Sequence, residues 1–341
     1  MTAPDVLLDQ PLLRPLALGA LRLPNRVVMA PLTRARATNP GLLPTELHAA
    51  YYAQRASAGL IVSEGVWVGE DAIAFPHVPG LFTDGQTAAW RRVTGLVRAL
   101  GGRIAAQLWH AGSAAPGEMS GTDIAALVGA YASAAARARD AGFDGVEIAA
   151  GGVYPLARFL NARLNSRTDA YAPGGGRPLL DVADAVCEAW DGERRVGVRL
   201  SPYWSWRDQP HAEGPCPWIP DEAHLARVDG VVEALARRPL AYLHLRGPAP
   251  GPDEAAVARY RRLYDGPLIA NHGFDGASGA ALIATGTADA VSYARHFIAN
   301  PDLVSRLALD APLASSDRAT HYTGGARGYV DHPLWTPAGP N

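Results

Sequence analysis

The sequence of 341 residues contains no lysine, and all 31 of its basic residues are arginine. A chain without lysine cannot form a lysine Schiff base, which excludes class I aldolase chemistry and pyridoxal phosphate anchored through lysine. Because arginine codons are richer in G and C than lysine codons, this composition also fits a GC-rich genome.

Cysteine is scarce as well, and the two that occur, Cys187 and Cys216, stand in no C-x-x-C or metal-ligand spacing. We expect two reduced thiols in a cytoplasmic protein. The chain has no apolar run long enough to span a bilayer and no secretory pattern at its N-terminus. With a net charge of only −2, a general attraction to nucleic acid or to anionic membranes is not expected either.

Eight short apolar runs, most of them bounded by glycine or proline, recur along the chain. Such runs are typical of parallel strands that are covered on both faces. The expected strands are Arg26–Pro31, Gly59–Gly65, Arg103–His110, Phe143–Ala150, Arg195–Pro202, Leu240–Gly247, Pro267–Gly273 and Asp289–Phe297.

Helical patterns separate these runs, and three of them open at a threonine suited to an N-cap, Thr45, Thr83 or Thr122. The patterns span 45–57, 83–100, 122–142, 178–190, 220–237, 252–265, 276–286 and 301–310. Strict alternation of eight strands and eight helices predicts an α/β fold, a (β/α)8 TIM barrel. An open doubly wound sheet is the alternative, but no G-x-G-x-x-G follows the first strand. We expect a single domain over residues 1–341, with an irregular arm at about 311–341.

Functional residues of a barrel cluster where its strands end at the C-terminal face. The residues expected there are Thr33, Glu64, Gln107, Trp109, His110, Tyr154, Arg199, His244, His272 and Arg295. This set is rich in hydrogen-bond donors and poor in carboxylates, so neither a metal site nor the paired carboxylates of a glycosidase is expected. We interpret His110 and His244 as structural histidines.

Arg295 is placed at the end of the eighth strand, beside the loop 271–274 that follows the seventh. That corner is the common phosphate site of barrels, although a salt bridge across the rim is an alternative role. Arg199 lies inside the mouth, where a buried guanidinium requires an anion or several acceptors.

Eight strings in order along the chain resemble the motifs of one enzyme family. They are MAPLTRARA (29–37), YYAQRASAGLIVSEG (51–65), QLWHAG (107–112), AGFDGVEI (141–148), NSRTDAY (165–171), VGVRLSP (196–202), FIANPDL (297–303) and GYVDHP (328–333). With these strings the chain resembles the old yellow enzymes, FMN-dependent ene reductases, over most of its length.

The resemblance implies FMN at the C-terminal face of the barrel and NAD(P)H as the reductant. Thr33 would bond the flavin O4, Gln107 and Arg199 would face the pyrimidine edge, and Arg295 would hold the phosphate. The implied cofactor residues are Pro31, Leu32, Thr33, Gly65, Gln107, Arg199, His272, Gly273, Ala294 and Arg295. His272 and Ala294 each replace a glycine of the family pattern.

One departure from the pattern concerns substrate activation. The family reduces electron-poor C=C bonds, holds the substrate carbonyl with a His and an Asn, and protonates carbon with a Tyr. Ala149 and Gly152 occupy the His and Asn positions, while Tyr154 occupies that of the proton donor. Each missing donor corresponds to about 3–4 kcal/mol of transition-state stabilisation. The chain could therefore reduce a substrate with non-standard activation, dehydrogenate or rearrange a biosynthetic intermediate, or bind flavin silently.

A second departure is the short segment between QLWHAG and the third helix, where the family carries a capping hairpin. A more open pocket favours a bulky, specialised metabolite as substrate. The residues expected to line it are Phe75, Trp109, Ala149, Gly152 and Tyr329. Trp204, Trp206 and Trp218 could add an apolar wall or simply pack on the barrel. We expect a monomer or homodimer that acts on small molecules.

Overall fold

The computed structural model describes residues 10–204, 220–249 and 251–337. Eight parallel strands form a closed barrel in chain order, and the last strand pairs with the first, which confirms the predicted TIM barrel. The strands are β3 (Val27–Met29), β4 (Leu60–Trp67), β5 (Ile104–Trp109), β6 (Gly145–Ala150), β7 (Val196–Leu200), β8 (Tyr242–Arg246), β9 (Leu268–Asn271) and β10 (Ala290–Tyr293).

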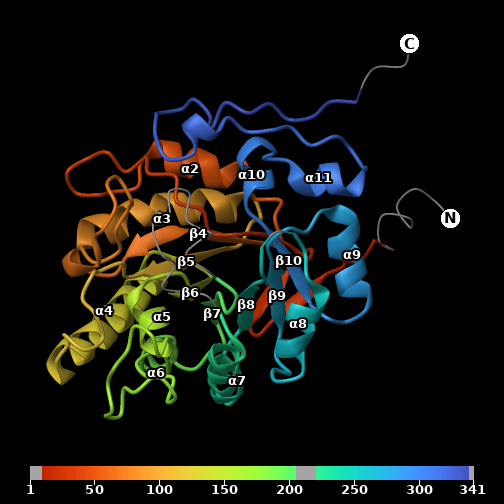
Figure 1. Ribbon diagram of the computed structural model, residues 1–341. Coiled ribbons are helices and arrows are strands. Elements are labelled where there is room, and N and C mark those ends of the chain that lie inside the picture. The colour runs from red at the N-terminus through yellow and green to blue at the C-terminus, as the bar shows by residue number, and fades with distance from the viewer. Residues whose placement is uncertain (1–9, 205–219, 250, 338–341) are drawn as a thin grey trace.

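Helices surround this barrel (Figure 1). They are α2 (Glu46–Ala53), α3 (Asp84–Ala99), α4 (Gly121–Asp140), α5 (Pro155–Leu160), α6 (Leu179–Ala189), α7 (Glu222–Ala236), α8 (Glu254–Arg261), α9 (Gly276–Ala284), α10 (Arg295–Ala299) and α11 (Leu303–Ala308). Two of these are short additions to the predicted set, α5 after β6 and α10 after β10. Both follow strand ends at the C-terminal face, so they belong to the region that carries the site.

Alternation along the strands builds two apolar cores. In β3, Val28 points into the barrel, while Val27 and Met29 pack outward against helices. The interior core continues into a hairpin that the sequence analysis did not predict, β1 (Leu16–Leu18) with β2 (Leu21–Leu23). Since Leu18, Leu21 and Leu23 join the interior cluster, the hairpin closes the N-terminal end of the barrel and leaves the opposite end open for a site.

Two of the three threonine N-caps are confirmed, because α2 begins after Thr45 and α3 after Thr83. The third was wrong, since α4 begins after Ser120 rather than Thr122. Ser120 Oγ accepts the amide of Asp123, and the Asp123 carboxylate accepts the amide of Ser120. This reciprocal pair satisfies two backbone donors at once, so it outcompetes a threonine two residues later.

The eighth strand also ends earlier than predicted. β10 stops at Tyr293, and Ala294 adopts a helical conformation that turns the chain into α10. Arg295 is therefore the first residue of α10 and not the last residue of a strand. The apolar string of this region contains no glycine or proline that could have marked the break.

Candidate active site at the C-terminal face of the barrel

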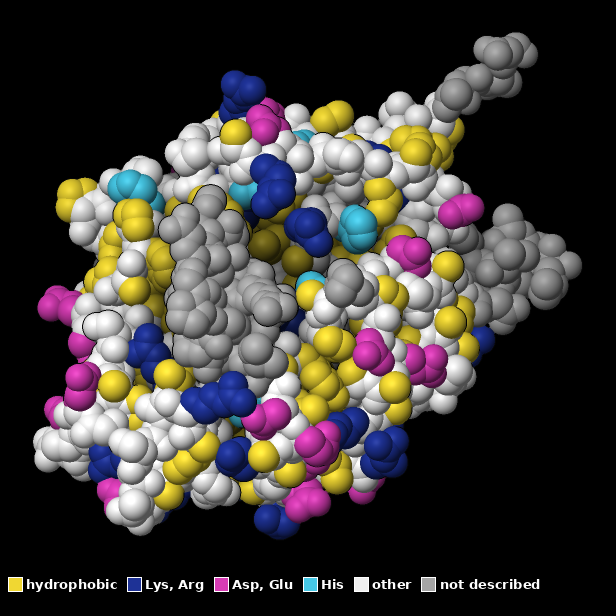
Figure 2. Space-filling view, in the orientation of Figure 1, with side chains coloured by type: hydrophobic (Ala, Val, Ile, Leu, Met, Phe, Trp, Pro, Cys, Tyr) yellow, Lys and Arg dark blue, Asp and Glu magenta, His cyan; other side chains and the backbone are white. Residues whose placement is uncertain are grey.

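A cavity of about 640 Å³, here called the central cavity, opens at the C-terminal ends of the strands. Its lining residues are Pro31, Leu32, Thr33, Ala35, Phe75, Pro76, Gln107, Trp109, Ala149, Gly151, Gly152, Tyr154, Arg199, Ser201, Trp204, Arg246 and Tyr322. Figure 2 shows a recess in the molecular surface that is bordered by hydrophobic and arginine side chains. Trp206 and Trp218, expected as a possible wall, lie outside the described residues.

A second cavity of about 320 Å³, here called the side cavity, lies where β9 and β10 end. Its lining residues are Asn271, His272, Gly273, Phe274, Ser292, Tyr293, Ala294, Arg295 and His296. The two cavities together contain every residue predicted to bind the cofactor except Gly65. A planar group in the central cavity and an anion in the side cavity would thus face the side chains that the sequence analysis assigned to each.

Gly65 serves the site in a different way. It is buried in β4, and a Cβ atom there would lie 2.5 Å from the Trp109 ring. Because only glycine fits beneath that ring, Gly65 determines where Trp109 stands in the cavity wall.

A buried polar network supports Arg199 from below. Its Nη1 lies 2.6 Å from Nε2 of His244, and its Nη2 donates to Oδ1 of Asn271 at 2.7 Å. Gln107 Nε2 donates to Glu147 Oε1 at 2.8 Å, and His244 Nδ1 lies 2.8 Å from Glu147 Oε2. Both carboxylate oxygens of Glu147 are therefore engaged, and the side chains of Gln107 and Arg199 are held in fixed orientations.

Protonation within this network follows from burial. Burial and the neighbouring Arg199 lower the pKa of His244 to about 4, so its ring is neutral at pH 7. Since a carboxylate only accepts, His244 Nδ1 must carry the proton and donate to Glu147, which leaves Nε2 as an acceptor for Arg199. Burial opposes ionisation of Glu147, but His244 and Arg199 outweigh it and lower its pKa. The prediction that His244 is a satisfied core histidine is confirmed.

The backbone of the side cavity has an unusual conformation. His272 and Gly273 have consecutive positive φ angles of 94° and 81°, a combination that glycine adopts most easily. A Cβ atom at position 273 would lie 2.3 Å from the backbone of Gly251, so the loop after β8 packs closely there. Arg295 lines the same cavity and supplies a cation, which makes the chemistry of this cavity suitable for a phosphate.

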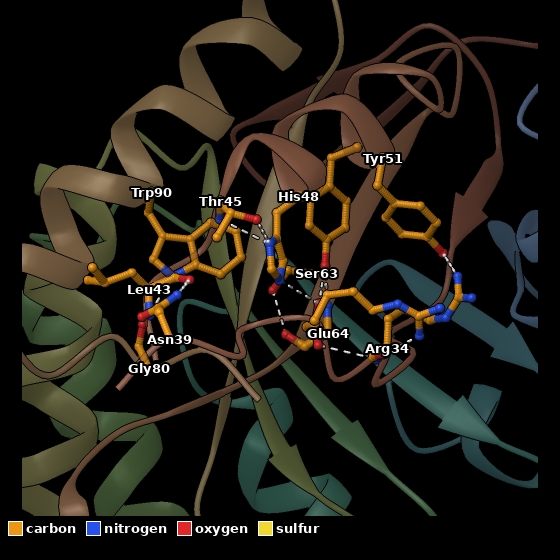
Figure 3. Close-up of polar contacts among 12 residues, drawn as sticks. Arg34, Asn39, Leu43, Thr45, His48, Tyr51, Ser63, Glu64, Gly80 and Trp90 are labelled. Atoms are coloured by element: carbon orange, nitrogen blue, oxygen red, sulfur yellow. Dashed lines mark hydrogen bonds and ion pairs between the residues drawn. The ribbon is translucent and has the colours of Figure 1, made fainter. Parts of the chain in front are cut away.

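The loop that follows β3 is fixed by a buried carboxylate, shown in Figure 3. Glu64 Oε2 accepts a hydrogen bond from the backbone amide of Arg34 at 3.2 Å. The backbone amide of Glu64 donates to the Tyr52 hydroxyl at 2.9 Å. His48 Nε2 lies 3.8 Å from Glu64 Oε1. Burial raises the pKa of Glu64 to about 7, although bonds and charges from Arg34 oppose that shift. Thr33, which immediately precedes Arg34, is thereby positioned in the cavity wall.

The side chain of Arg34 fastens the C-terminal arm, residues 311–337, to this loop. Nε donates to the carbonyl of His321 at 3.0 Å, and Nη2 donates to that of Gly328 at 2.7 Å. The arm runs along α2, α10 and α11 (Figure 1). It brings Tyr322, which the sequence analysis did not select, into the central cavity.

Tyr329 was predicted to line the pocket, and this prediction was wrong. Its side chain is fully buried and stacks on Tyr51 with ring centroids 4.1 Å apart. The guanidinium groups of Arg34 and Arg36 lie over its ring at about 5 Å. Aromatic stacking and two cations hold Tyr329 beneath the arm, so it anchors the arm while Tyr322 reaches the cavity.

The wall beside β6 has few polar groups. Ala149 and Gly152 both line the cavity, and neither offers a side-chain donor where the family pattern has His and Asn. Tyr154 follows them, and its ring makes a T-shaped contact with Trp109 at a centroid distance of 4.9 Å. Burial, reinforced by Tyr322, raises the pKa of Tyr154 to about 12. Phe75 stacks on Trp109 at 5.5 Å and is 44% exposed, so it forms the outer edge of this wall.

The shortened capping region is visible in the fold, because residues 110–120 between β5 and α4 contain no strand or helix. Arg158 of α5 crosses this segment and donates to the carbonyls of Ser113 and Gly112. The segment is thus held against α5, and none of its residues is among those that line the central cavity.

A third cavity lies at the opposite end of the barrel, where β5, β6 and β7 begin. Arg98, Arg103, Asp144 and Arg195 are among its lining residues. These arginines donate to backbone carbonyls or to neighbouring carboxylates. Barrel enzymes act at the C-terminal face, so we place the active site in the central and side cavities. The described residues contain no group of three or more His, Cys, Asp or Glu side chains that could hold a metal ion.

Comparison with known proteins supports the same assignment. The model of the NADH:flavin oxidoreductase / NADH oxidase family matches residues 11–120 and 113–313. The chain belongs to this family. It is 35% identical to the flavin oxidoreductase hxnT of Emericella nidulans over 95% of this chain and 98% of that protein. It is 34% identical to a putative 12-oxophytodienoate reductase 4 of Oryza sativa subsp. japonica, over 95% and 93%.

Solved structures agree with the sequence matches. Morphinone reductase in complex with tetrahydroNAD superposes with a TM-score of 0.85 at 36% identity, over 96% of this chain and 98% of that one. The old yellow enzyme homologue of Zymomonas mobilis gives a TM-score of 0.85 at 34% identity, over 95% and 99%. The protein is thus an FMN-dependent oxidoreductase of this family, with a nicotinamide nucleotide as reductant.

The residues present fit FMN. Thr33, Gln107 and Arg199 offer a hydroxyl, an amide and a guanidinium around a cavity with apolar walls. His272, Gly273 and Arg295 line the adjoining cavity that suits a phosphate. Within the described ranges, no helix is long and apolar enough to cross a membrane.

Proposed function

We propose that the protein reduces an electron-poor C=C bond in a bulky, specialised small molecule, and that it activates this substrate without the His and Asn pair of its family. One observation carries the proposal. The same cavity contains the donors suited to FMN (Thr33, Gln107 and Arg199) and a phenol at Tyr154, but only Ala149 and Gly152 where the pair would stand.

When bound, FMN supplies the capacity to take a hydride from NAD(P)H and deliver it to carbon. The chain holds the donors that orient it. Arg199 would place a positive charge beside the pyrimidine edge, where it would stabilise negative charge, and its bonds to His244 and Asn271 prevent it from turning away. Arg295, which lines the side cavity, would hold the phosphate.

Tyr154 is the proposed proton donor to the substrate α-carbon. With its pKa raised to about 12 by burial and by Tyr322, the phenol remains protonated at neutral pH. The edge contact with Trp109 fixes its ring, so the hydroxyl has a defined direction. General acid catalysis requires a side chain that is protonated at the working pH and held in a fixed position, and Tyr154 meets both conditions.

Two features of the described residues support a large substrate. Residues 110–120 form no strand or helix, and Ala149 and Gly152 stand where the family pattern has larger side chains. We infer further that the protein is cytoplasmic, given its few cysteines, and that it acts as a monomer or homodimer.

Purified protein tests the proposal. It should be yellow or become so with added FMN, and NADPH should bleach the flavin absorbance. Turnover should be found among bulky conjugated carbonyl compounds and should be slow with 2-cyclohexenone. Colourless protein that refuses FMN would contradict the proposal, as would brisk reduction of 2-cyclohexenone.

A further inference from the structure

Ser201 is a polar side chain of the central cavity that neither the binding of the cofactor nor the proton transfer uses. It follows directly on the last residue of β7. Within the part of the chain that the structure describes, its hydroxyl has no hydrogen-bond partner. A hydroxyl that faces a cavity with its hydrogen unused can donate to a ligand there.

The strand register places Ser201 next to the space where Ala149 and Gly152 offer no donor. Ala149 pairs with Arg199 in the parallel ladder of β6 and β7. Ser201 lies two residues beyond Arg199, so it points the same way and stands one step closer to the cavity mouth. Two residues beyond Ala149, the corresponding position is Gly151, which also lines the cavity.

Gly151 leaves the room that the hydroxyl occupies. A Cβ atom at this position would lie 2.4 Å from Ser201 Oγ and 3.0 Å from Ser201 Cβ. A larger residue at 151 would therefore have to displace the serine side chain. Because position 151 is glycine, Ser201 rests directly on the backbone of its neighbour at the cavity wall.

The other polar side chains of the cavity have different tasks or positions. Four of them suit the cofactor or the proton transfer, namely Thr33, Gln107, Arg199 and Tyr154. Tyr322 belongs to the C-terminal arm and is 60% exposed, so water competes with any bond from its hydroxyl. Arg246 already interacts with other residues of the chain. This leaves Ser201 as the donor closest to the gap in the β6 wall.

We propose that Ser201 donates a hydrogen bond to the carbonyl oxygen of the substrate, and that it replaces in part the absent His and Asn pair. This inference rests on the proposed function, because it assumes reduction of a C=C bond that a carbonyl group activates. As a hydride adds to the β-carbon and Tyr154 gives its proton to the α-carbon, the C=C π bond is lost and negative charge develops on the carbonyl oxygen. A hydroxyl beside that oxygen stabilises the charge.

A single neutral donor also agrees with slow reduction of 2-cyclohexenone. Trp109 and Phe75 stack nearly in parallel in the cavity wall, with an interplanar angle of 17°. A flat apolar body that packs on these rings is held in place, so its carbonyl can remain at Ser201. 2-Cyclohexenone has no such body, and one hydroxyl orients it less well than two donors would.

The inference is tested by infrared difference spectroscopy of the oxidised, FMN-loaded protein with trans-4-phenyl-3-buten-2-one, labelled with ¹³C at its carbonyl. Without NADPH this flat ketone is not reduced, so its C=O stretching frequency reports the hydrogen bond alone. The frequency should be lower in the unmodified protein than in hexane. This lowering should disappear in Ser201→Ala and persist in Ser201→Thr. Ser113→Ala, which removes an exposed hydroxyl outside the cavity, should leave it unchanged.

Stopped-flow reoxidation of the reduced protein by the same ketone is the second measurement. Ser201→Ala should slow this half-reaction by about 10²-fold, which is typical of the loss of one oxyanion donor, while bleaching by NADPH remains unchanged. The variants Tyr322→Phe and Arg246→Gln should retain the lowered C=O frequency.

The inference would be overturned by an unshifted C=O frequency in the unmodified protein, by a lowering that survives in Ser201→Ala, or by failure of the oxidised protein to bind the ketone. Loss of the lowering in Tyr322→Phe or Arg246→Gln, with Ser201→Ala unaffected, would assign the bond to that residue instead. Failure of the proposed function is distinguishable, because it would show before the ketone is added, as protein that binds no FMN or that NADPH does not bleach.

Discussion

Polar groups of β7 to β10 form a connected network that rests on Glu147 in the middle of β6, whereas the cavity wall at the end of β6 presents almost no polar side chain. On the first side, Arg199 is fixed through His244 and Asn271, with Glu147 beneath them. On the second, Ala149 and Gly152 leave Tyr154 as the polar side chain of the wall. Buried polar groups destabilise the folded state unless their hydrogen bonds are satisfied, and a fully satisfied network is rigid. The network therefore holds the Arg199 side chain in a fixed position.

This contrast separates two tasks that the family performs in one cavity. The groups that suit the cofactor are intact and supported from below, while those that activate a carbonyl are missing. The network keeps the Arg199 guanidinium at the cavity wall although burial of a cation is costly. The contrast therefore favours an altered substrate over a lost cofactor.

The largest effect is expected from Arg199→Gln. Without its guanidinium the buried acceptors His244 Nε2 and Asn271 Oδ1 lose their donor, which should cost about 1–3 kcal/mol of stability. Affinity for FMN should fall by about tenfold to hundredfold as a charge-assisted contact is lost. Urea unfolding and FMN titration measure both. Unchanged FMN affinity, with Arg227→Gln as the surface control, would show that the network does not serve the cofactor.

A gain of function should result from restoring the pair, Ala149→His with Gly152→Asn. Gly152 has a φ of 67°, which asparagine tolerates better than most residues, and its Cβ would meet only the Tyr154 ring at 3.2 Å. Since each oxyanion donor is worth about 10²–10³ in rate, reduction of 2-cyclohexenone should rise at least about 100-fold. Ala149→Leu, which fills the same space without a donor, should produce no rise. If Ala149→Leu raises the rate of 2-cyclohexenone reduction as much as the double variant does, the missing donors are not what limits enone reduction.

Tyr154→Phe tests the polar residue that remains on the β6 side. Loss of a general acid should slow substrate reduction by about 10²-fold or more, while reduction of the flavin by NADPH remains unchanged. Stopped-flow measurement of the two half-reactions separates these effects. Equal slowing of both half-reactions would indicate a general disturbance of the cavity instead of a lost proton.

The smallest effect concerns Glu64, which supports the loop of Thr33. Its surroundings contain Arg34, Arg36, His48, Tyr51, Tyr52 and Tyr329. With its pKa raised from 4.5 to about 7, Glu64 favours the folded state most below pH 4.5, and this contribution is lost as pH rises through 7. Glu64→Gln should therefore raise Tm relative to the unmodified protein by a few degrees more at pH 8 than at pH 5.

The exposed Glu188→Gln on α6 serves as the control for that comparison. It should shift Tm equally at both pH values. A Glu64→Gln effect that is likewise independent of pH would show that Glu64 does not titrate near neutrality.

Sequence patterns predicted the barrel and most of the cavity lining for a physical reason. A buried parallel strand must be apolar and short, and its end must carry the functional side chain, so Gln107 and Arg199 could be placed from the strand boundaries alone. The hairpin β1–β2 was not predicted, because two strands of three residues each are too short to show a clear alternation of apolar and polar residues. Glu147 and Asn271 were missed because their importance lies in contacts between strands far apart in the sequence.

The C-terminal arm illustrates the limit most clearly. Two tyrosines, Tyr322 and Tyr329, stand seven residues apart in an irregular segment, and nothing periodic indicates which one reaches the cavity. Their places depend on Arg34 and Arg36, whose side chains donate hydrogen bonds to backbone carbonyls of the arm. These arginines lie almost 300 positions earlier in the sequence. Only the folded chain shows that Tyr329 is the buried anchor.

The central claim is that the protein binds FMN and lets NADPH reduce it, but lacks the donors that activate an ordinary enone. Anaerobic stopped-flow mixing of the FMN-loaded protein tests it in a single experiment, first with NADPH and then with 2-cyclohexenone. The account predicts rapid bleaching of the flavin absorbance by NADPH, followed by little or no recovery with the enone. Rapid recovery of the flavin absorbance would contradict the account, because it would mean that enone reduction is not slowed by having Ala149 and Gly152 in place of the His and Asn pair.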